Sequence, residues 1–462
     1  MVARLDWPRW AGALSLAFAA ALVGLMAGID PRLAIVAALA AALVLITFTD
    51  LAAGLAVFTF VAFIEVIPLP GAVVSVSKLA GLLLALSWFA VVTTRRDAEL
   101  DFFAKYPIMS ASIVLFVAWT LVTTVWSTST PEALSSAGRY GLNAILFLIV
   151  FTAVREKRQL RWVLVAFVLG AAMTAITGIV APTGEEAKDR LGSGALDPSE
   201  LSAVLVSGVA LSAGVIALYK HSPLIRLGAS LVAVFSLVAI WLTASRGGLV
   251  ALVAALIAAV ALSGRWRAQI TVVAALFATL TVFYFALFAP DEIRERVTAP
   301  TQGQERIEEG RTTIWQVAWR AFEANPVGGV GAGNFPVVSR EYLLQPGVLA
   351  RTDEIIGETP KVVHNIYLEV ATETGVVGLA LFLGVVGFGI GSMLAAARTF
   401  GRMGQADMQA ASICIAVGVI GILAADMFVS DQYSKQLWLL LGLGPALLQM
   451  ARTARDRSER AA

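Results

Sequence analysis

The chain is divided into long apolar segments by short polar breaks, and this pattern permits few folds. A bilayer span needs about 17–25 mostly apolar residues, and a single segment satisfies its own backbone in lipid only as a helix. Fourteen segments qualify: 11–28, 32–49, 51–69, 77–94, 108–126, 137–153, 161–181, 199–219, 224–243, 247–263, 268–289, 364–397, 407–428 and 434–451. The sequence therefore predicts an all-α polytopic membrane protein with about 12–14 transmembrane helices, the break at Thr49-Asp50 being the weakest. The first segment is expected to be an uncleaved span, because another span follows at once.

Composition excludes most soluble classes. Hydrophobic residues make up 58% of the 462 and charged residues 14%, against about 25% charged in soluble domains. In a multi-spanning membrane protein the net charge of +2 carries no information about nucleic acid, and we expect no nucleic-acid partner. The single cysteine, Cys414, excludes an intrachain disulfide and leaves the redox compartment undetermined. No Cys/His or clustered-carboxylate motif indicates a metal, and we expect no cofactor.

The distribution of basic residues predicts the orientation. Nineteen of the 34 Lys and Arg fall on the side of the N-terminus, seven in short loops and span ends opposite, and eight in the long loop 290–363. By the positive-inside rule, both termini are cytosolic and the long loop is extracytoplasmic. The expected organisation is transmembrane helices 1–11 with short loops over 1–289, the extracytoplasmic loop 290–363 with helices of its own, C-terminal transmembrane helices over 364–451, and a basic cytosolic tail, 452–462.

His364 is one of two histidines and opens the run 364–378, where the long loop meets the next apolar segment. Imidazole has an unperturbed pKa of about 6.5, nearest to neutrality among side chains. In a helix starting at His364, Gly375 lies about three turns on and nearly on the same face, with Gly378 about 40° away. These glycines permit close helix packing or a groove for a lipid tail. A helix-cap histidine with an ordinary small-residue contact is the plainer interpretation of these residues alone.

Arg246 lies in Ser245-Arg-Gly-Gly248, between two apolar segments. An arginine at membrane depth costs about 2.5–3.5 kcal/mol and needs a carboxylate, water or an anionic ligand. Gly247 and Gly248 allow close approach to the backbone, and a helix starting here would favour an anion at its N-terminus. Guanidinium can chelate phosphate oxygens in a bidentate manner. A snorkelling arginine at a helix end is an equal alternative.

Arg190 lies in the second-longest external loop, before Asp197-Pro198-Ser199, where the next helix is expected to start. The simpler interpretation of Arg190 is a solvated loop residue paired with a neighbouring acid. Arg311 precedes a predicted helix that Thr312 or Thr313 would cap and that ends before Pro326.

That helix would carry one aromatic face, Trp315, Trp319 and Phe322, which more often serves packing than a sugar platform. Arg311 at its start would either face the same anion as Arg246 or snorkel. The glycines of 328–335 do not form a phosphate loop, because no Lys-Ser/Thr follows and no strand precedes them; we expect a flexible connection there.

Together these segments resemble the O-antigen ligase family, which includes related polymerases and protein O-oligosaccharyltransferases. The family's ligase motif is His, then Asn, Ser or Gln, nine residues, Gly, two residues, and Gly, Thr or Tyr; here it reads His364-Asn365, then Gly375-Val-Val-Gly378. Further matches are Ser245-Arg246-Gly247-Gly248, Arg190…Asp197-Pro198 (with Ser199 where Asn is usual), Gly310-Arg311…Trp315, and 329–335. The resemblance covers about residues 185–385.

The resemblance implies a metal-independent, inverting GT-C-type glycosyltransferase of the bacterial inner membrane, as in lipopolysaccharide biosynthesis. It would move a glycan from a polyprenyl diphosphate carrier to an acceptor hydroxyl on a lipid or glycan at the extracytoplasmic face. His364 would take the proton of that hydroxyl. Arg190 and Arg246, with Arg311 as a third candidate, would neutralise the diphosphate leaving group.

Two alternatives stay open within the same family: a polymerase that joins repeat units, and an enzyme with a protein acceptor. A lipid or solute transporter is the alternative of another class. It would need charges at mid-membrane or inverted repeats. No clear repeat is present, and Glu65 and Asp426 are isolated acids near external span ends.

Overall fold

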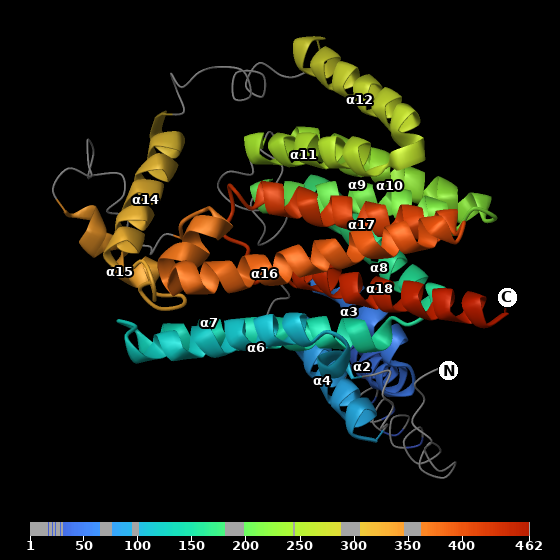
Figure 1. The fold of residues 1–462 in the computed structure, drawn as a ribbon, viewed down its shortest axis with the longest axis horizontal. Helices are drawn as coiled ribbons and strands as arrows, with labels where there is room; N and C mark the ends of the chain where they lie inside the picture. Colours follow the sequence, from blue (N-terminus) through green and yellow to red (C-terminus); the bar gives the residue numbers. More distant parts are fainter. Residues whose placement is uncertain are drawn as a thin grey trace.

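A computed structural model describes residues 31–64, 76–94, 101–180, 198–243, 245–287, 305–345 and 362–461, with isolated positions between 17 and 28. Every regular element in these ranges is a helix (Figure 1). The helices are α2 (Pro31–Thr49), α3 (Leu51–Ile64), α4 (Val76–Thr94), α5 (Phe102–Lys105), α6 (Pro107–Val122), α7 (Thr130–Ala153), α8 (Lys157–Val180), α9 (Pro198–Leu218), α10 (Pro223–Leu242), α11 (Arg246–Leu262), α12 (Arg267–Leu287), α14 (Glu305–Ala324), α15 (Phe335–Leu343), α16 (Ile366–Arg402), α17 (Ala406–Ala425) and α18 (Lys435–Ala461), with short 3-10 helices η1 (Thr123–Val125) and η3 (Gly264–Trp266).

The all-α polytopic class predicted from the sequence is confirmed. Thirteen of the fourteen predicted segments coincide with helices, and the first, 11–28, lies largely outside the described residues. Ten of the described helices are long and apolar enough to cross a membrane by length and composition. The weak break at Asp50 is real, since its carboxylate accepts hydrogen bonds from the backbone N–H of Ala52 (3.0 Å) and Ala53 (3.2 Å) and so caps α3.

Small residues let the central helices approach closely. In the contact of α9 with α17, a Cβ on Gly214 would lie 3.3 Å from Cβ of Cys414, and a Cβ on Gly418 would lie 3.7 Å from Ser207. Such contacts replace the hydrophobic driving force that is missing between helices in lipid. Helix α16 packs in turn against α17, α18 and α6, so it lies within the bundle.

Helices α14 and α15 lie at one end of the bundle, beside the start of α16, and the C-terminal end of α18 lies at the opposite end (Figure 1). They share a small apolar cluster with the residue before His364: Ile314, Val317, Ala318, Phe335, Leu343 and Val363 are all buried. The middle of α14, helix α15 and the chain entering α16 are therefore packed together.

Helix α14 differs from its prediction at one end. It ends at Ala324, before Pro326, as expected, but begins at Glu305, so Thr312 and Thr313 lie inside it and do not cap it. The predicted aromatic face divides: Trp315 is half-buried toward the bundle, whereas Trp319 is 53% exposed. The basic segment at the C-terminus continues α18 as helix to Ala461.

Candidate functional site

His364 lies in the two-residue approach to α16 and has an unusual backbone. Its φ of 56° places it in the left-handed region, the one non-glycine residue there among those the structure describes. This conformation costs an L-residue about 1–2 kcal/mol, so neighbouring contacts must hold it. Strained residues of this kind concentrate at functional sites.

Tertiary hydrogen bonds hold the backbone on both sides of the imidazole. The N–H of His364 donates to Oγ of Ser430 at 2.8 Å. The N–H of Ile366 donates to the carbonyl of Asp426 at 2.9 Å. Indole Nε1 of Trp315 donates to the carbonyl of Val363 at 3.0 Å. The histidine is thus fixed by the α17–α18 connection, residues 426–434, and by α14.

Asn365 is the N-cap of α16. Its Oδ1 accepts from the backbone N–H of Tyr367 and Leu368, both at 3.0 Å, while its own φ and ψ (−160°, 109°) are extended. A short polar side chain is what this position requires, because the first N–H groups of a helix have no partner within it. Asn365 therefore turns the chain into α16 directly after His364.

A buried carboxylate that the sequence analysis left without a role organises this segment. Glu369 is 3% exposed, and its carboxylate accepts from the backbone N–H of Val363 (3.1 Å), from Nε2 of Gln432 (2.8 Å) and from the hydroxyl of Ser430. The signal was present, since an acid five residues after His364 in an apolar segment needs partners. Two of these partners, Ser430 and Gln432, lie more than 60 residues further along the chain.

Phe428 connects the histidine region to the arginine motif. A Cβ on Gly247 would lie 3.2 Å from Cβ of Phe428, so the glycine allows this contact. The ring of Phe428 lies 6.4 Å from that of Trp315, centroid to centroid. Gly247 follows Arg246 directly, and Trp315 binds the residue before His364. The structure thus brings the arginine motif and the histidine to the same connection, 426–434.

Arg246 is the first residue of α11, as the sequence predicts. Ser245 caps the helix, its Oγ accepting from the backbone N–H of Gly248 at 3.1 Å and donating to Oγ of Ser199 at 3.2 Å. A Cβ on Gly248 would lie 2.4 Å from Ser202, so α11 starts in direct contact with α9. The half-buried Arg246 therefore lies where the helix dipole favours an anion.

Of the other two candidate arginines, the structure describes Arg311 but not Arg190. Arg311 is half-buried on α14, four residues before Trp315 and so on the same side of the helix. Arg190 lies outside the described residues, although the helix expected to follow it does begin at Pro198. No three His, Cys, Asp or Glu side chains within the described ranges are grouped closely enough to hold a metal ion.

The predicted alignment of Gly375 and Gly378 on the helix face of His364 is wrong. The α16 backbone leaves helical geometry at Gly375 (φ 69°, ψ −174°), so the three-turn alignment of Gly375 and Gly378 with His364 does not hold. A Cβ on Gly375 would lie 2.0 Å from the carbonyl oxygen of Val327, in the glycine-rich connection. A Cβ on Gly378 would meet its own neighbour Thr374 at 2.0 Å and Trp119 at 3.2 Å. These positions are filled by protein and leave no lipid groove.

The glycine-rich connection, predicted to be flexible, is instead bonded to the kink in α16. The kink frees the carbonyls of Thr372, Glu373 and Thr374 from their helical partners. These accept hydrogen bonds from the N–H of Val330 (2.9 Å), the N–H of Gly331 (2.9 Å) and Nε1 of Trp119 (2.7 Å) respectively. The exchange satisfies a buried helix break without water.

Asp426, which the sequence analysis describes as an isolated acid near a span end, lies near two other acids in the structure. It is fully buried, and its carboxylate oxygens have no hydrogen-bond partner among the described residues. Burial, together with the nearby acids Asp431 and Glu200, raises the pKa of Asp426 well above its usual range. The raised pKa means that burial favours the protonated, uncharged form of this carboxyl group.

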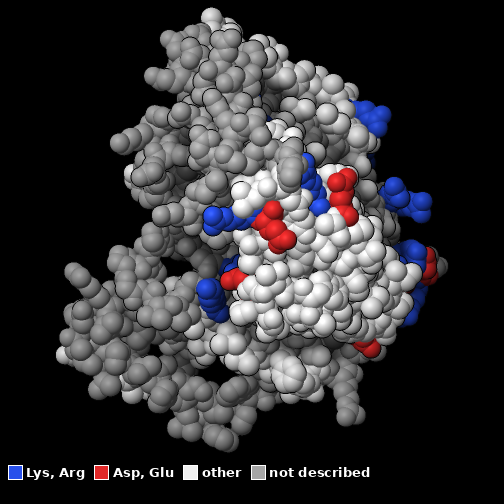
Figure 2. All heavy atoms as spheres, turned by 90° about the vertical axis from the view of Figure 1, so that its left-hand side faces the viewer, with Lys and Arg blue, Asp and Glu red and all other residues white. Residues whose placement is uncertain are grey.

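At the end of the bundle that carries these groups, the charged side chains of the described residues are mixed in sign. Figure 2 shows Lys and Arg next to Asp and Glu in small mixed groups on a mostly uncharged surface. Together, the fold and this site define a polytopic all-α membrane protein with a clamped histidine and an arginine-led helix meeting at one end.

Comparison with known proteins supports the resemblance noted from the motifs. Residues 231–383 match the family model described as O-antigen ligase. This resemblance is thereby confirmed. The matched range contains Arg246, Arg311 and His364 but not the connection 426–434. No curated protein matches the chain.

Proposed function

We propose that the protein transfers a glycan from a polyprenyl diphosphate carrier to an acceptor hydroxyl at the extracytoplasmic face. The observation that carries this proposal is the strained, clamped backbone of His364 beside the connection that also contacts the arginine motif. A base for the acceptor and cations for a diphosphate are the two groups that such a transfer needs.

In the proposed reaction, His364 takes the proton of the acceptor hydroxyl as its oxygen attacks C1 of the sugar. The bond between C1 and the diphosphate oxygen breaks on the opposite face, which inverts the configuration. Negative charge grows on the leaving diphosphate, and Arg246, with Arg190 and Arg311, neutralises it. Guanidinium groups supply the positive charge at neutral pH without a titration.

Replacing the two histidines in turn tests this proposal. His364→Ala should reduce transfer from the prenyl carrier by a factor on the order of 10²–10⁴. His221→Ala is the matched control, since this exposed histidine lies in the connection of α9 and α10. Undiminished transfer by His364→Ala would refute the role of base, whereas absence of transfer in the wild type as well would favour the transporter alternative.

The length of the product distinguishes the two family activities. A ligase attaches the donor glycan once, whereas a polymerase extends a donor that carries one repeat. If the purified protein lengthens a one-repeat donor by itself, the polymerase alternative is correct. A product linked to a lipid other than the polyprenyl diphosphate carrier identifies a lipid acceptor.

A further inference from the structure

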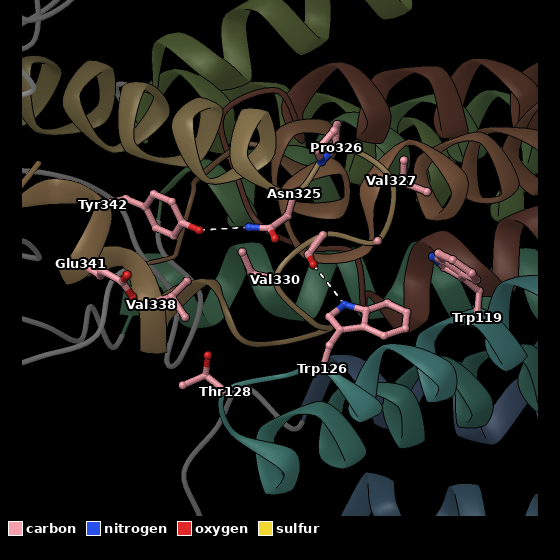
Figure 3. A pocket seen from close by; sticks show the side chains of 12 residues that line it. Trp119, Trp126, Thr128, Asn325, Pro326, Val327, Val330, Val338, Glu341 and Tyr342 are labelled. Carbon is pink, nitrogen blue, oxygen red and sulfur yellow. Dashed lines mark hydrogen bonds between the residues drawn. The ribbon is translucent and has the colours of Figure 1, made fainter.

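A pocket of about 580 Å³ lies beside the glycine-rich connection that is bonded to the α16 kink (Figure 3). It is formed by the end of α6 and the segment after η1, by the glycine-rich connection, and by α15. The twelve lining residues are Trp119, Trp126, Thr128, Asn325, Pro326, Val327, Gly328, Gly329, Val330, Val338, Glu341 and Tyr342. Its volume falls within the roughly 300–1,000 Å³ typical of small-molecule sites.

The aromatic rings of the pocket are held in place by their own indole groups. Nε1 of Trp126 donates to the carbonyl of Gly329 at 3.1 Å, and Nε1 of Trp119 donates to the carbonyl of Thr374 at 2.7 Å. The two ring centroids are 5.9 Å apart. Trp126 nevertheless remains 43% exposed. A ring that is fixed at its edge and open on its surface offers a rigid apolar platform.

Neutral polar groups stand opposite these rings. Nδ2 of Asn325 donates to the hydroxyl of Tyr342 at 3.0 Å, and this hydroxyl can donate its proton to a ligand oxygen (Figure 3). Glu341 is exposed at the rim and offers acceptors for hydroxyl groups. None of the twelve lining residues is Lys or Arg, so the pocket is not built for a phosphate. Aromatic surface with amide, hydroxyl and carboxylate groups matches a sugar ring, which has apolar C–H faces and a polar hydroxyl edge.

The pocket is hydrogen-bonded to α16, the helix that follows His364. Its floor, residues 326–331, receives and supplies the hydrogen bonds that the kink at Gly375 leaves unmade, including the bond from the N–H of Val376 to the carbonyl of Pro326 at 2.8 Å. The segment Ile366–Thr374 separates the kink from His364, a rise of about 13 Å along the helix. A ligand in the pocket therefore lies away from the reacting bond, on a support shared with the base.

We propose that this pocket binds a neutral saccharide unit of the glycan, away from the bond that reacts. The inference rests on the proposed function for the source of the sugar, which is either the donor glycan or a glycan acceptor. Binding energy from such a remote unit orients the reacting end of the substrate.

Direct binding tests the pocket without requiring transfer. The probes are neutral gluco-, galacto- and mannotrisaccharides, with saturation-transfer NMR on the full-length protein in detergent micelles. At least one probe should bind to the wild type and equally to His364→Ala. Trp126→Ala should raise its Kd about tenfold or more, as expected for the loss of a central aromatic contact. Trp319→Ala, an exposed tryptophan outside the pocket, should leave it unchanged.

A second, more conservative variant keeps the test valid if Trp126→Ala does not fold. Tyr342→Phe removes one hydroxyl and keeps the packing, and it should also weaken binding. The proposal is overturned if no trisaccharide binds, if Trp126→Ala and Trp319→Ala behave alike, or if added phospholipid alone displaces the sugar.

Transfer kinetics then distinguish the two sources of the sugar. Trp126→Ala raises KM for the lipid-linked donor if the unit belongs to the donor, and KM for the acceptor if it belongs to the acceptor. Absence of transfer in every variant, with sugar binding retained, would refute the proposed function and not this site.

Discussion

Ser430 joins the backbone of His364 to a buried carboxylate: its Oγ accepts from the N–H of His364 at 2.8 Å and donates to Glu369. One hydroxyl thereby satisfies a donor beside the imidazole and an acceptor on α16. Because His364 has a positive φ, this bond helps to hold a conformation that the chain would not adopt by itself.

The first prediction concerns this bond. Ser430→Ala removes the hydrogen bond that the N–H of His364 makes and one of the two that Oε2 of Glu369 accepts, the other coming from the N–H of Val363. A buried polar group left unsatisfied costs about 1–3 kcal/mol. We expect a lower unfolding temperature and a lower kcat, with KM for the donor little changed, since Ser430 positions the base. Ser430→Thr keeps the hydroxyl and should restore kcat, and Ser458→Ala, at an exposed serine of α18, is the control. An increase in KM for the donor with kcat unchanged would contradict the positioning role.

The second prediction concerns the kink in α16. Gly375→Ala places a Cβ 2.0 Å from the carbonyl oxygen of Val327 at a positive φ, so it should destabilise the protein by more than about 2 kcal/mol. Gly387→Ala is the matched control in the same helix, where a Cβ meets nothing within 4 Å. That control should be neutral or stabilising by up to about 1 kcal/mol. Thermal unfolding in detergent measures both, and equal unfolding temperatures would show that the kink is not required.

The third prediction concerns Arg246. Arg246→Lys retains the charge but cannot chelate two phosphate oxygens, so transfer should fall and KM for the donor should rise, on the order of tenfold. The conservative control is Arg226→Lys, at an exposed position of α10. Initial rates over a range of lipid-linked donor concentrations provide the measurement. Full activity in Arg246→Lys would argue against contact with the diphosphate.

The fourth prediction concerns pH. The folded-state pKa of Asp426 is raised above 3.8, its value in the absence of burial, so the folded protein binds a proton that the unfolded chain releases. Stability should therefore fall as pH rises from about that value through the raised pKa. Asp426→Asn removes the ionisable group and should reduce this fall. Unfolding temperatures of both proteins from pH 4 to 8 measure the difference, and identical pH profiles would contradict it.

Helix positions were largely predictable because their causes are local. Apolar length determined thirteen of the described helices, and single residues determined several starts, such as the cap Ser245 for α11 and Pro198 for α9. Helix α14 was misjudged at its start because Thr312 and Thr313 are good caps that the chain does not use. A good N-cap residue inside an amphipathic segment does not become the start of the helix when tertiary packing continues on its N-terminal side.

The site was predictable only in part. His364 and Arg246 could be singled out because a titratable or charged residue in an apolar chain needs a reason to be there, and Asn365 followed from the motif that the chain shares with the O-antigen ligase family. Glu369 and Ser430 could not be paired from the sequence, since they are 61 residues apart and only the packing of α16 and α17 brings them together.

The sequence by itself determined that this chain crosses a membrane as helices, because backbone groups in lipid must be satisfied within each segment. It also determined which residues are candidates for chemistry and, through its motifs, the resemblance to the O-antigen ligase family. Only the tertiary structure decided the backbone of His364 and the kink at Gly375. Both conformations are locally unfavourable, and they exist because hydrogen bonds from distant segments, residues 426–434 and 326–331, offset their cost.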